Sequence, residues 1–200
     1  VSAEGALQNL NAEIPDFNFK KTENQAKAAW NNELSKIAVE STDKNKLSIF
    51  YTALYHCFSS PNLFMDVDGK YFGTDKKIHQ AEGFDNYTVF SLWDTYRTEH
   101  PLLSIIDRKR TTDFINTFLN QYKNGGLLPI WELAGNETFC MIGNHSIPVI
   151  LDAYRKGING FDANLAFEAM KSAVNRNQFG LDSYRNNGLV LADDEHESVS

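Results

Sequence analysis

Apolar residues recur along this chain every three or four positions, which is the spacing of a helix that buries one face. Six stretches show this spacing, and each predicts one amphipathic helix. Together they predict a chain built from helices. Their apolar members are Trp30, Leu34 and Ile37; Leu47, Phe50, Tyr51, Leu54 and Phe58; Val89, Leu92, Trp93 and Tyr96; Phe114, Ile115, Phe118, Leu119 and Tyr122; Ile147, Ile150, Leu151 and Tyr154; and Ala166, Phe167, Met170 and Val174.

Polar residues at the ends of these stretches support the helices. Thr22 with Gln25 forms a capping box before the first stretch, while Asp43 opens the second and Asp162 caps the sixth. A further short helical turn is expected to begin near Pro101. Signals for strands are weak, because no Asn-Gly or Asp-Gly turn joins two alternating segments. The predicted fold class is therefore all-α.

Two predicted connections are long, at residues 59–86 and 125–144. Loops of this length in a compact domain are usually functional. Both are rich in aromatic residues, and neither has the Gly/Ser composition of a flexible linker.

Composition and charge exclude some classes of partner. The chain of 200 residues is 42% hydrophobic, so it can bury a core. Lys and Arg total 19 against 26 Asp and Glu, which gives a net charge of −7 and no basic surface for nucleic acid or anionic lipid. Its apolar runs fall far short of the roughly 20 residues that span a bilayer.

The motifs of common metal sites are missing from the sequence. The two cysteines, Cys57 and Cys140, cannot form a Cys-based zinc site and are interpreted as small buried apolar residues. Asp66 begins an Asp-Val-Asp-Gly segment, but the sixth and twelfth positions of an EF-hand loop fall on Tyr71 and Lys77. That segment is interpreted as a turn whose Asp side chains accept backbone N–H groups, with a loop of a sugar-binding cleft as the alternative.

The segment Ser-Leu-Trp-Asp-Thr-Tyr-Arg carries candidate binding chemistry. On a helix, Trp93 and Arg97 lie four positions apart, and Asp94 lies on the adjoining face. An indole ring beside a carboxylate and a guanidinium suits carbohydrate, because the ring contacts C–H groups and the charged groups hydrogen-bond hydroxyls. The alternative is a buried Trp beside an intrahelical Asp–Arg pair.

A second candidate segment is Trp-Glu-Leu-Ala-Gly-Asn-Glu-Thr, at residues 131–138. It combines a Trp, an amide and the carboxylates Glu132 and Glu137, which is a composition typical of a sugar site. A solvated loop has a similar composition, and the sequence does not separate the two interpretations.

Three segments then resemble glycoside hydrolase family 92, the bacterial calcium-dependent exo-α-mannosidases. In chain order they are FYTALYHCFSSPNLFMDVDGKYFG, YTVFSLWDTYRTEHPLLSIID and GGLLPIWELAGNETFCMIGNHSIPVILDAYRKGINGFDANLAFEAMKSA. The likeness extends over residues 30–200. It implies a helical linker at residues 1–29 that follows an absent β-sandwich, and the truncated first half of an (α/α)6-barrel catalytic domain at residues 30–200.

The resemblance also implies an inverting reaction that uses a carboxylic acid and a carboxylate base. The family segments that carry them, similar to TEGNAWQ and GDEDNGQMSAW, do not occur in this sequence, so both groups are expected beyond Ser200. Asp94 is then expected to hold hydroxyls of the terminal mannose. Trp93, Arg97, Glu137 and His145 are weaker candidates to line the same cleft. Calcium is the expected cofactor, with most of its ligands outside this chain.

These expectations define a fragment of an α-mannosidase that removes terminal α-linked mannose, with α-1,2 the expected linkage, from glycans in the periplasm or at the cell surface. The chain is expected to be a piece of a longer protein, since Ser198 or Ser200 would be a good helix N-cap and no helix follows it in this sequence. The fragment alone is expected to be inactive and to expose apolar surface or self-associate. The alternative is a non-catalytic helical module that binds carbohydrate or protein.

Overall fold

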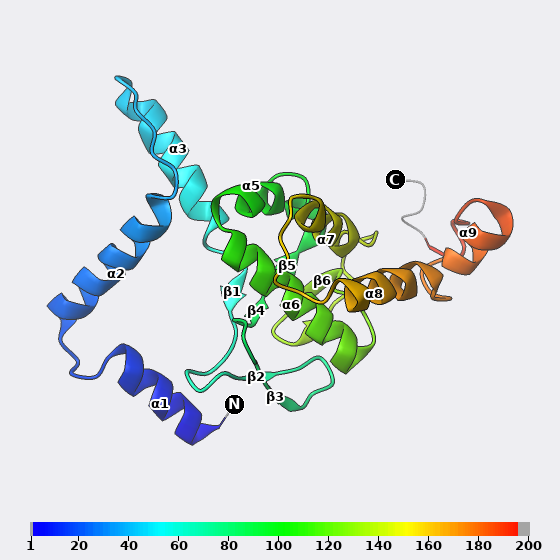
Figure 1. Ribbon diagram of the computed structural model, residues 1–200, viewed down its shortest axis with the longest axis horizontal. Helices are drawn as coiled ribbons and strands as arrows, with labels where there is room; N and C mark the ends of the chain where they lie inside the picture. Colours follow the sequence, from blue (N-terminus) through cyan, green and yellow to red (C-terminus); the bar gives the residue numbers. More distant parts are fainter. Residues whose placement is uncertain (1, 196–200) are drawn as a thin grey trace.

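The computed structural model describes residues 2–195, and about 52% of the chain is helical. Its elements fall into two regions, here called the arm and the body (Figure 1). The arm consists of α1 (Ala3–Glu13), α2 (Phe19–Leu34) and α3 (Lys44–Cys57). The main helices of the body are α5 (Glu99–Ile106), α6 (Arg108–Gly125), α7 (Ser146–Arg155) and α8 (Ala163–Asn175), and the short α9 (Leu181–Asn187) lies beyond α8.

The body is built around α6, whose apolar stripe is fully buried. Phe114 and Phe118 have no exposed surface, and the ring of Phe90 meets both edge-on at centroid distances of 5.4 and 4.8 Å. Aromatic pairs favour this arrangement. Asp162 caps α8 by accepting hydrogen bonds from two backbone N–H groups, as the sequence predicts. Helix α5 likewise confirms the helical turn expected near Pro101.

The helix predicted over residues 89–96 is wrong in its first half. The chain forms strands β4 (Tyr87–Thr88) and β5 (Phe90–Ser91), and only a four-residue helix, α4 (Leu92–Thr95), follows. Between the two strands Val89 adopts a φ of 68°, which a helix does not allow. Pairing of β5 with a distant strand satisfies its backbone groups instead.

Both long connections contain strands. The first holds β1 (Asn62–Leu63), which pairs with β4, and the hairpin of β2 (Lys70–Phe72) and β3 (Ile78–Gln80). The second holds β6 (Trp131–Leu133) and β7 (Asn136–Glu137), which join β5 in an antiparallel sheet of order β5-β6-β7. The strictly all-α expectation is therefore wrong, although helices dominate. Strands of two or three residues are too short to show an alternating pattern.

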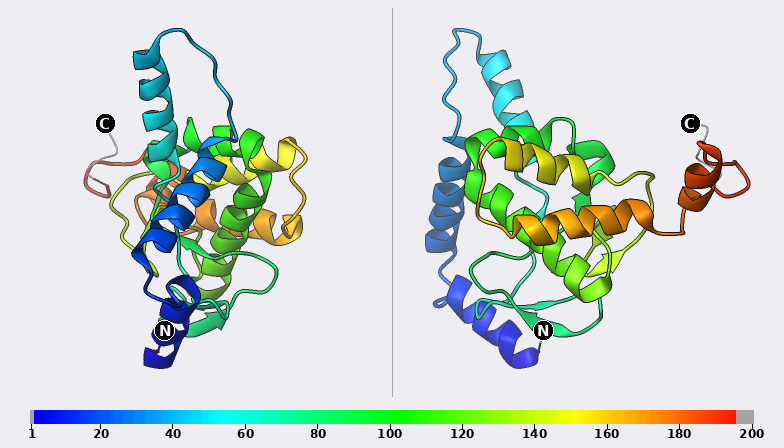
Figure 2. Two further views of the ribbon diagram at one scale, coloured as in Figure 1. Left: turned by 90° about the vertical axis from the view of Figure 1, so that its left-hand side faces the viewer. Right: turned by 45° about the vertical axis from the view of Figure 1, so that its right-hand side comes forward.

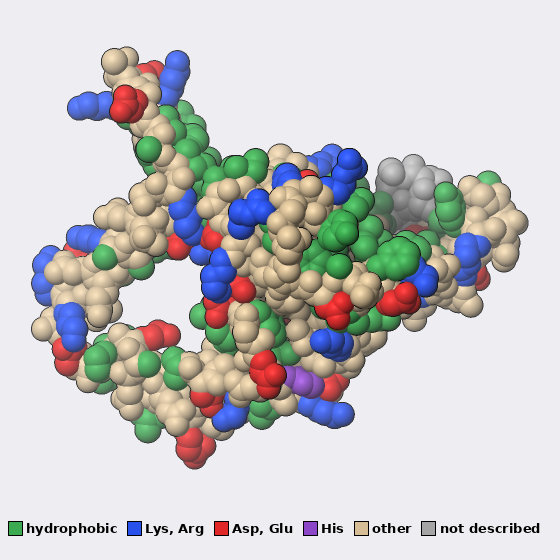
Figure 3. All heavy atoms as spheres, viewed as in Figure 1, with side chains coloured by type: hydrophobic (Ala, Val, Ile, Leu, Met, Phe, Trp, Pro, Cys, Tyr) green, Lys and Arg blue, Asp and Glu red, His purple; other side chains and the backbone are tan. Residues whose placement is uncertain are grey.

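The arm buries very little surface. No residue of α2 is buried, and Gly5 is the only buried residue of α1. The side chain of Asn9 donates to the Asp66 carboxylate and accepts from the Val67 N–H, both at 2.8 Å, so α1 returns to the body beside the β2–β3 hairpin (Figure 2). Asp68 accepts the Lys70 N–H, which confirms the turn interpretation of this segment. Figure 3 shows the opening that α1, α2 and the body enclose.

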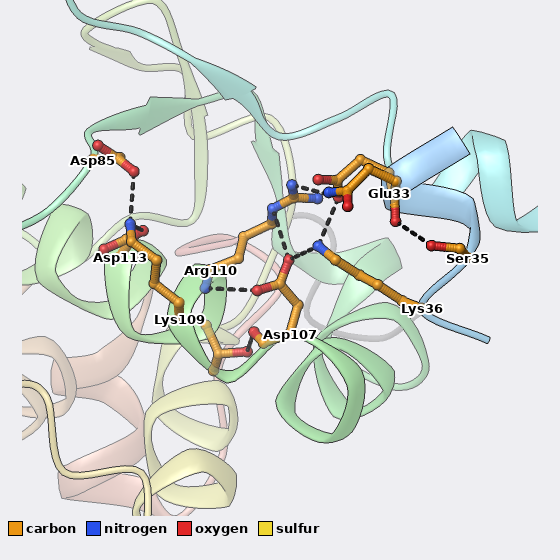
Figure 4. Close-up of polar contacts among 10 residues, drawn as sticks. Glu33, Ser35, Lys36, Asp85, Asp107, Lys109, Arg110 and Asp113 are labelled. Carbon is orange, nitrogen blue, oxygen red and sulfur yellow. Dashed lines mark hydrogen bonds and ion pairs between the residues drawn. The ribbon is translucent and has the colours of Figure 1, made fainter. Parts of the chain in front are cut away.

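Charged residues attach the arm to the body at the end of α2 (Figure 4). The Arg110 guanidinium of α6 contacts the Glu33 carboxylate of α2 at 2.8 Å and the Asp107 carboxylate at 3.3 Å. Lys36 pairs with both carboxylates, at 2.7 and 2.5 Å. The ring of Phe58 lies against both cations, 4.9 Å from Arg110 and 5.2 Å from Lys36. We call these five residues the junction cluster.

Further expectations concern the domain boundary, the cysteines, the C-terminal caps and a membrane span. The proposed boundary between residues 29 and 30 falls inside α2, and that domain assignment stays a proposal. The burial expected for the cysteines is wrong, because Cys140 is exposed and Cys57 is only half-buried. The caps expected at Ser198 and Ser200 lie outside the described residues. Among residues 2–195, no helix has the length and apolarity to cross a membrane.

Candidate substrate-binding site

The β5-β6-β7 sheet brings the two candidate segments together. Ser91 of β5 pairs with Trp131 of β6, and Phe90 pairs with Glu132. Segments about 40 positions apart in sequence therefore lie side by side, and α4 with its Asp94 begins directly after β5. Sequence spacing alone did not reveal this pairing.

Asp94 lies exposed in the first turn of α4. Its carboxylate accepts a hydrogen bond from the Ser91 hydroxyl at 2.5 Å. Among the ion pairs of residues 2–195, none joins Asp94 to Arg97. The intrahelical Asp–Arg pair considered from the sequence is therefore absent, and the Asp94 carboxylate retains lone pairs that a ligand can use.

Aromatic rings of α4 and the turn after it gather around His145. The ring of Trp93 meets His145 edge-on at 5.2 Å, and the ring of Tyr96 lies 4.4 Å from His145. The Arg97 guanidinium lies 5.6 Å from the Trp93 ring and 5.3 Å from the Tyr96 ring, and its Nε donates to the Tyr96 hydroxyl at 2.9 Å. Three of the five predicted site residues, Trp93, Arg97 and His145, therefore come together, and Asp94 follows Trp93 directly in α4. Tyr96 joins them, although the sequence pattern assigned it only to an apolar stripe.

His145 lies at the start of α7 and is half-buried. Burial lowers the pKa of its imidazole, and the nearby positive charge of Arg97 lowers it further. The ring is therefore neutral at pH 7. Its Nδ1 atom and the neighbouring Ser146 hydroxyl are buried without a hydrogen-bond partner in the described structure. A neutral imidazole can either donate or accept at such an atom.

Glu137, the fifth predicted site residue, lies in β7 and bonds to the backbone of its own hairpin. Its carboxylate accepts the backbone N–H groups of Ile130, Trp131 and Phe139 at 2.8 to 3.0 Å. No hydrogen bond or ion pair joins it to Asp94, Arg97 or His145 within the described residues. Glu137 therefore holds the β6–β7 hairpin in shape.

Glu132 is the most deeply buried carboxyl group of this region, with 1% of its surface exposed. Its two oxygens lie 3.0 Å from the Thr88 hydroxyl, and Oε1 accepts the Gly135 N–H at 2.7 Å. Burial raises the pKa of Glu132 to about 7, while these hydrogen bonds favour the ionised form. Sequence analysis did not distinguish it from a solvated loop carboxylate.

A cavity of about 270 Å³ is lined in part by the β6–β7 hairpin, and Asp94 is not among its lining residues. The carboxylates that reach it, Glu132 and Glu137, are both engaged in internal hydrogen bonds. We therefore place the candidate site at Asp94 and not in this cavity. Its lining is Thr74, Lys76, Gln121, Gly125, Leu127, Pro129, Glu132, Asn136 and Glu137.

The described residues do not assemble a metal centre. Nowhere in residues 2–195 do three or more His, Cys, Asp or Glu side chains gather so that they could hold an ion. Calcium binds six to eight oxygen ligands. The part of the chain that the structure describes therefore does not fit a complete calcium site.

Comparison with known proteins shows the family to which this chain is similar. The model of the glycosyl hydrolase family 92 catalytic domain matches residues 5–200. The structure of the family GH92 alpha-mannosidase BT3965 from Bacteroides thetaiotaomicron is 42% identical, with a TM-score of 0.94 over 100% of this chain and 27% of that one. The same alpha-mannosidase in complex with mannoimidazole has a TM-score of 0.92 at 41% identity, over 98% of this chain and 26% of that one.

A third structure is more distant. The GH92 inverting mannosidase BT2199 from the same organism is 29% identical, with a TM-score of 0.85 over 95% of this chain and 27% of that one. A search of the curated proteins finds no significant match. The chain thus spans about a quarter of the length of the solved relatives. Because the family model covers nearly all of its residues, the chain belongs to glycosyl hydrolase family 92.

Proposed function

We propose that this chain supplies part of the substrate site of a longer α-mannosidase, which removes terminal α-linked mannose from glycans. The observation that carries the proposal is the exposed carboxylate of Asp94 in α4, next in sequence to Trp93, whose ring meets the His145 ring that Tyr96 also contacts. A relative at 41% identity has been solved in complex with mannoimidazole, which supports a mannose-terminated substrate. We propose α-1,2 linkages as its target.

Each side chain of this group has a chemical task. The Asp94 carboxylate accepts hydrogen bonds from sugar hydroxyls, and the Ser91 hydroxyl holds one of its oxygens in place. The aromatic rings provide an apolar wall for the C–H face of the sugar. The guanidinium of Arg97 stays near this wall and can donate to a hydroxyl through the N–H groups that Tyr96 does not occupy.

Catalysis is proposed to use residues beyond Ser200. Inversion needs an acid and a base that can exchange protons with the leaving oxygen and with water. Glu132 is buried and Glu137 accepts three backbone hydrogen bonds, so neither is placed for this exchange. We likewise propose that most calcium ligands lie outside this chain, since no cluster of three His, Cys, Asp or Glu side chains occurs within residues 2–195. The half-barrel architecture and a periplasmic or cell-surface location remain parts of this proposal.

The test is Asp94→Ala in the full-length protein that carries this segment. Charge-assisted hydrogen bonds are worth about 1.5–3 kcal/mol each, so kcat/KM for an α-1,2-linked mannobiose should fall about a hundredfold or more. The melting temperature should change little, because Asp94 is exposed. Asp182→Ala is the matched control, since Asp182 is also an exposed carboxylate in the first turn of a helix.

Two outcomes contradict the proposal. A strongly lowered melting temperature with near-normal activity would make Asp94 a structural residue. Mannoside binding without hydrolysis by the full-length protein would favour the alternative, a non-catalytic carbohydrate-binding module. The 200-residue chain alone is expected to be inactive and to self-associate through exposed apolar residues such as Ile49 and Phe167.

A further inference from the structure

Three residues around the β5-β6-β7 sheet have an unusual backbone. Val89, Ala134 and Phe139 are not glycines, yet their φ angles are 68°, 49° and 53°. For a β-branched residue such as Val89 a positive φ is a strong outlier, because the side chain meets its own backbone. Such conformations persist only where the surroundings hold them, and they concentrate at functional sites.

The Glu132 side chain links two of these turns. It accepts hydrogen bonds from the Thr88 hydroxyl on one side and from the Gly135 N–H on the other. The Thr88 hydroxyl oxygen in turn accepts the Ala134 N–H at 2.6 Å. The turn at 88–89 and the turn at 134–135 are therefore tied together through one buried carboxyl and one buried hydroxyl.

This link is close to Asp94 along the chain. Val89 sets the direction in which β5 leaves the turn, and the half-buried Ser91 at the end of β5 donates its hydroxyl to the Asp94 carboxylate. An apolar side chain at position 132 would fill the same space without the cost of burying a carboxyl group. It would leave the Thr88 hydroxyl and the Gly135 N–H without this acceptor.

We infer that Glu132 and Thr88 are positioning residues that hold the strained turn at Val89, so that Ser91 and Asp94 face the sugar. This inference rests on the proposed role of Asp94 as a mannose ligand. Neither residue touches the substrate, and both act through the backbone between Thr88 and Asp94.

The first experiment uses the full-length protein and compares isosteric changes. Thr88→Val removes the hydroxyl but keeps the shape, and Glu132→Gln removes the negative charge. Each should lower kcat/KM for the mannobiose about tenfold, mainly through KM. Thr88→Ser keeps the hydroxyl and should restore kcat/KM to within about twofold of the wild type. Glu168→Gln, which changes an exposed carboxylate paired with Lys171, should have no effect.

A double-mutant cycle separates positioning from general destabilisation. In the Asp94→Ala background, Glu132→Gln should lower kcat/KM by no more than about twofold, because its effect passes through Asp94. A full tenfold loss in that background would overturn the inference. So would a Thr88→Ser variant as impaired as Thr88→Val.

Hydrogen exchange on the full-length protein tests the link without any activity. Thr88→Val and Glu132→Gln should speed exchange of the amides in residues 89–95 and 134–136 and leave α8 unchanged. Unchanged exchange in residues 89–95 would overturn the inference even if the enzyme is active. Faster exchange there, combined with a full-length protein that hydrolyses no mannoside, would support the link and reject only the proposed function.

Discussion

The arm and the body are held in place by different interactions. The body buries a continuous apolar cluster from α5, α6, α7, α8 and the sheet. The arm has one buried residue in α1, none in α2 and one in α3. It meets the body through Asn9 at one end and through the charged junction cluster at the other.

The body and the arm therefore differ in how strongly they are stabilised. Burial of apolar surface stabilises a region cooperatively, whereas hydrogen bonds and ion pairs in contact with water contribute little each. The arm is therefore expected to open locally at a lower free energy than the body unfolds. The candidate site lies on the body side, where α4 packs on the sheet and α7, and this suits a site that must hold a fixed geometry.

The largest effect is expected from the body core. Phe114 has no exposed surface and contacts the rings of Phe90, Tyr87 and His100. Phe114→Ala should lower the free energy of unfolding by about 3–5 kcal/mol, since it leaves a cavity. Ile49→Ala in α3 is the control, because Ile49 is 69% exposed and its loss should change stability by less than about 0.5 kcal/mol. Urea unfolding measures both, and similar losses would remove the distinction between the regions.

The next effect is the dependence of stability on pH that Glu99, in the first turn of α5, should cause. Burial raises the pKa of Glu99 to about 7, and its Oε1 atom is buried without a partner in the described structure. A carboxyl group whose folded pKa lies above its unfolded value stabilises the fold below pH 4.5, and this stability is lost as pH rises through 7. Glu99→Gln should remove the loss, so the variant should gain on the order of 3 kcal/mol relative to the wild type between pH 5 and pH 8.

Two other buried groups, common to both proteins, also make stability depend on pH in this range. Burial raises the pKa of Glu132 to about 7 and lowers that of His100 to about 4, so their effects on stability have opposite signs. The difference between wild type and Glu99→Gln therefore isolates Glu99. Chemical unfolding at a series of pH values measures it. A pH-independent difference would show that Glu99 does not titrate in the folded chain.

A smaller effect is expected at the junction cluster. Arg110→Met removes the contacts to Glu33 and Asp107 and the cation over Phe58. We expect a loss of about 1–2 kcal/mol in the attachment of the arm, because these side chains are partly shielded from water. Hydrogen exchange should become faster in α2 and α3 but not in α8, and added salt should reduce the difference.

Lys27→Met is the matched control for the junction cluster. It removes an ion pair with Glu23 in which the lysine side chain is 65% exposed. Such a pair contributes little, so exchange in the arm should stay unchanged. If Lys27→Met loosens the arm as much as Arg110→Met, the junction cluster is not the point of attachment.

The same comparison explains what could be predicted from the sequence. The stripe through Phe114 and Phe118 was predicted correctly, since a long buried helix repeats its apolar spacing over many turns. Residues 89–96 also follow that spacing, yet tertiary pairing of Phe90 and Ser91 with β6 overrides it. Very short strands and positive φ angles such as that of Val89 depend on distant partners, which the local pattern does not contain.

The candidate site was predicted in its chemistry but not in its assembly. The motif placed Trp93, Asp94 and Arg97 together because they are neighbours in sequence. His145 was proposed only from the family resemblance, and the structure brings it into ring contact with Trp93 and Tyr96. Glu137 and Glu132 looked alike in the sequence. Their hydrogen bonds to hairpin backbone and to Thr88 come from the fold.

The smallest effect concerns the start of α2, where the sequence predicts Thr22 as the cap and the structure has Asn18. The Asn18 side chain accepts the Lys21 N–H at 3.0 Å. Asn18→Ala should cost about 1 kcal/mol of local helix stability, and Asn18→Ser should retain most of it. Because α2 buries no residue, packing does not compensate for the lost cap. Amide exchange in the first turns of α2 should therefore rise, while the urea midpoint of the body stays constant. Thr22→Ala should change neither quantity; if it loosens α2 more than Asn18→Ala does, the helix begins where the sequence pattern placed it.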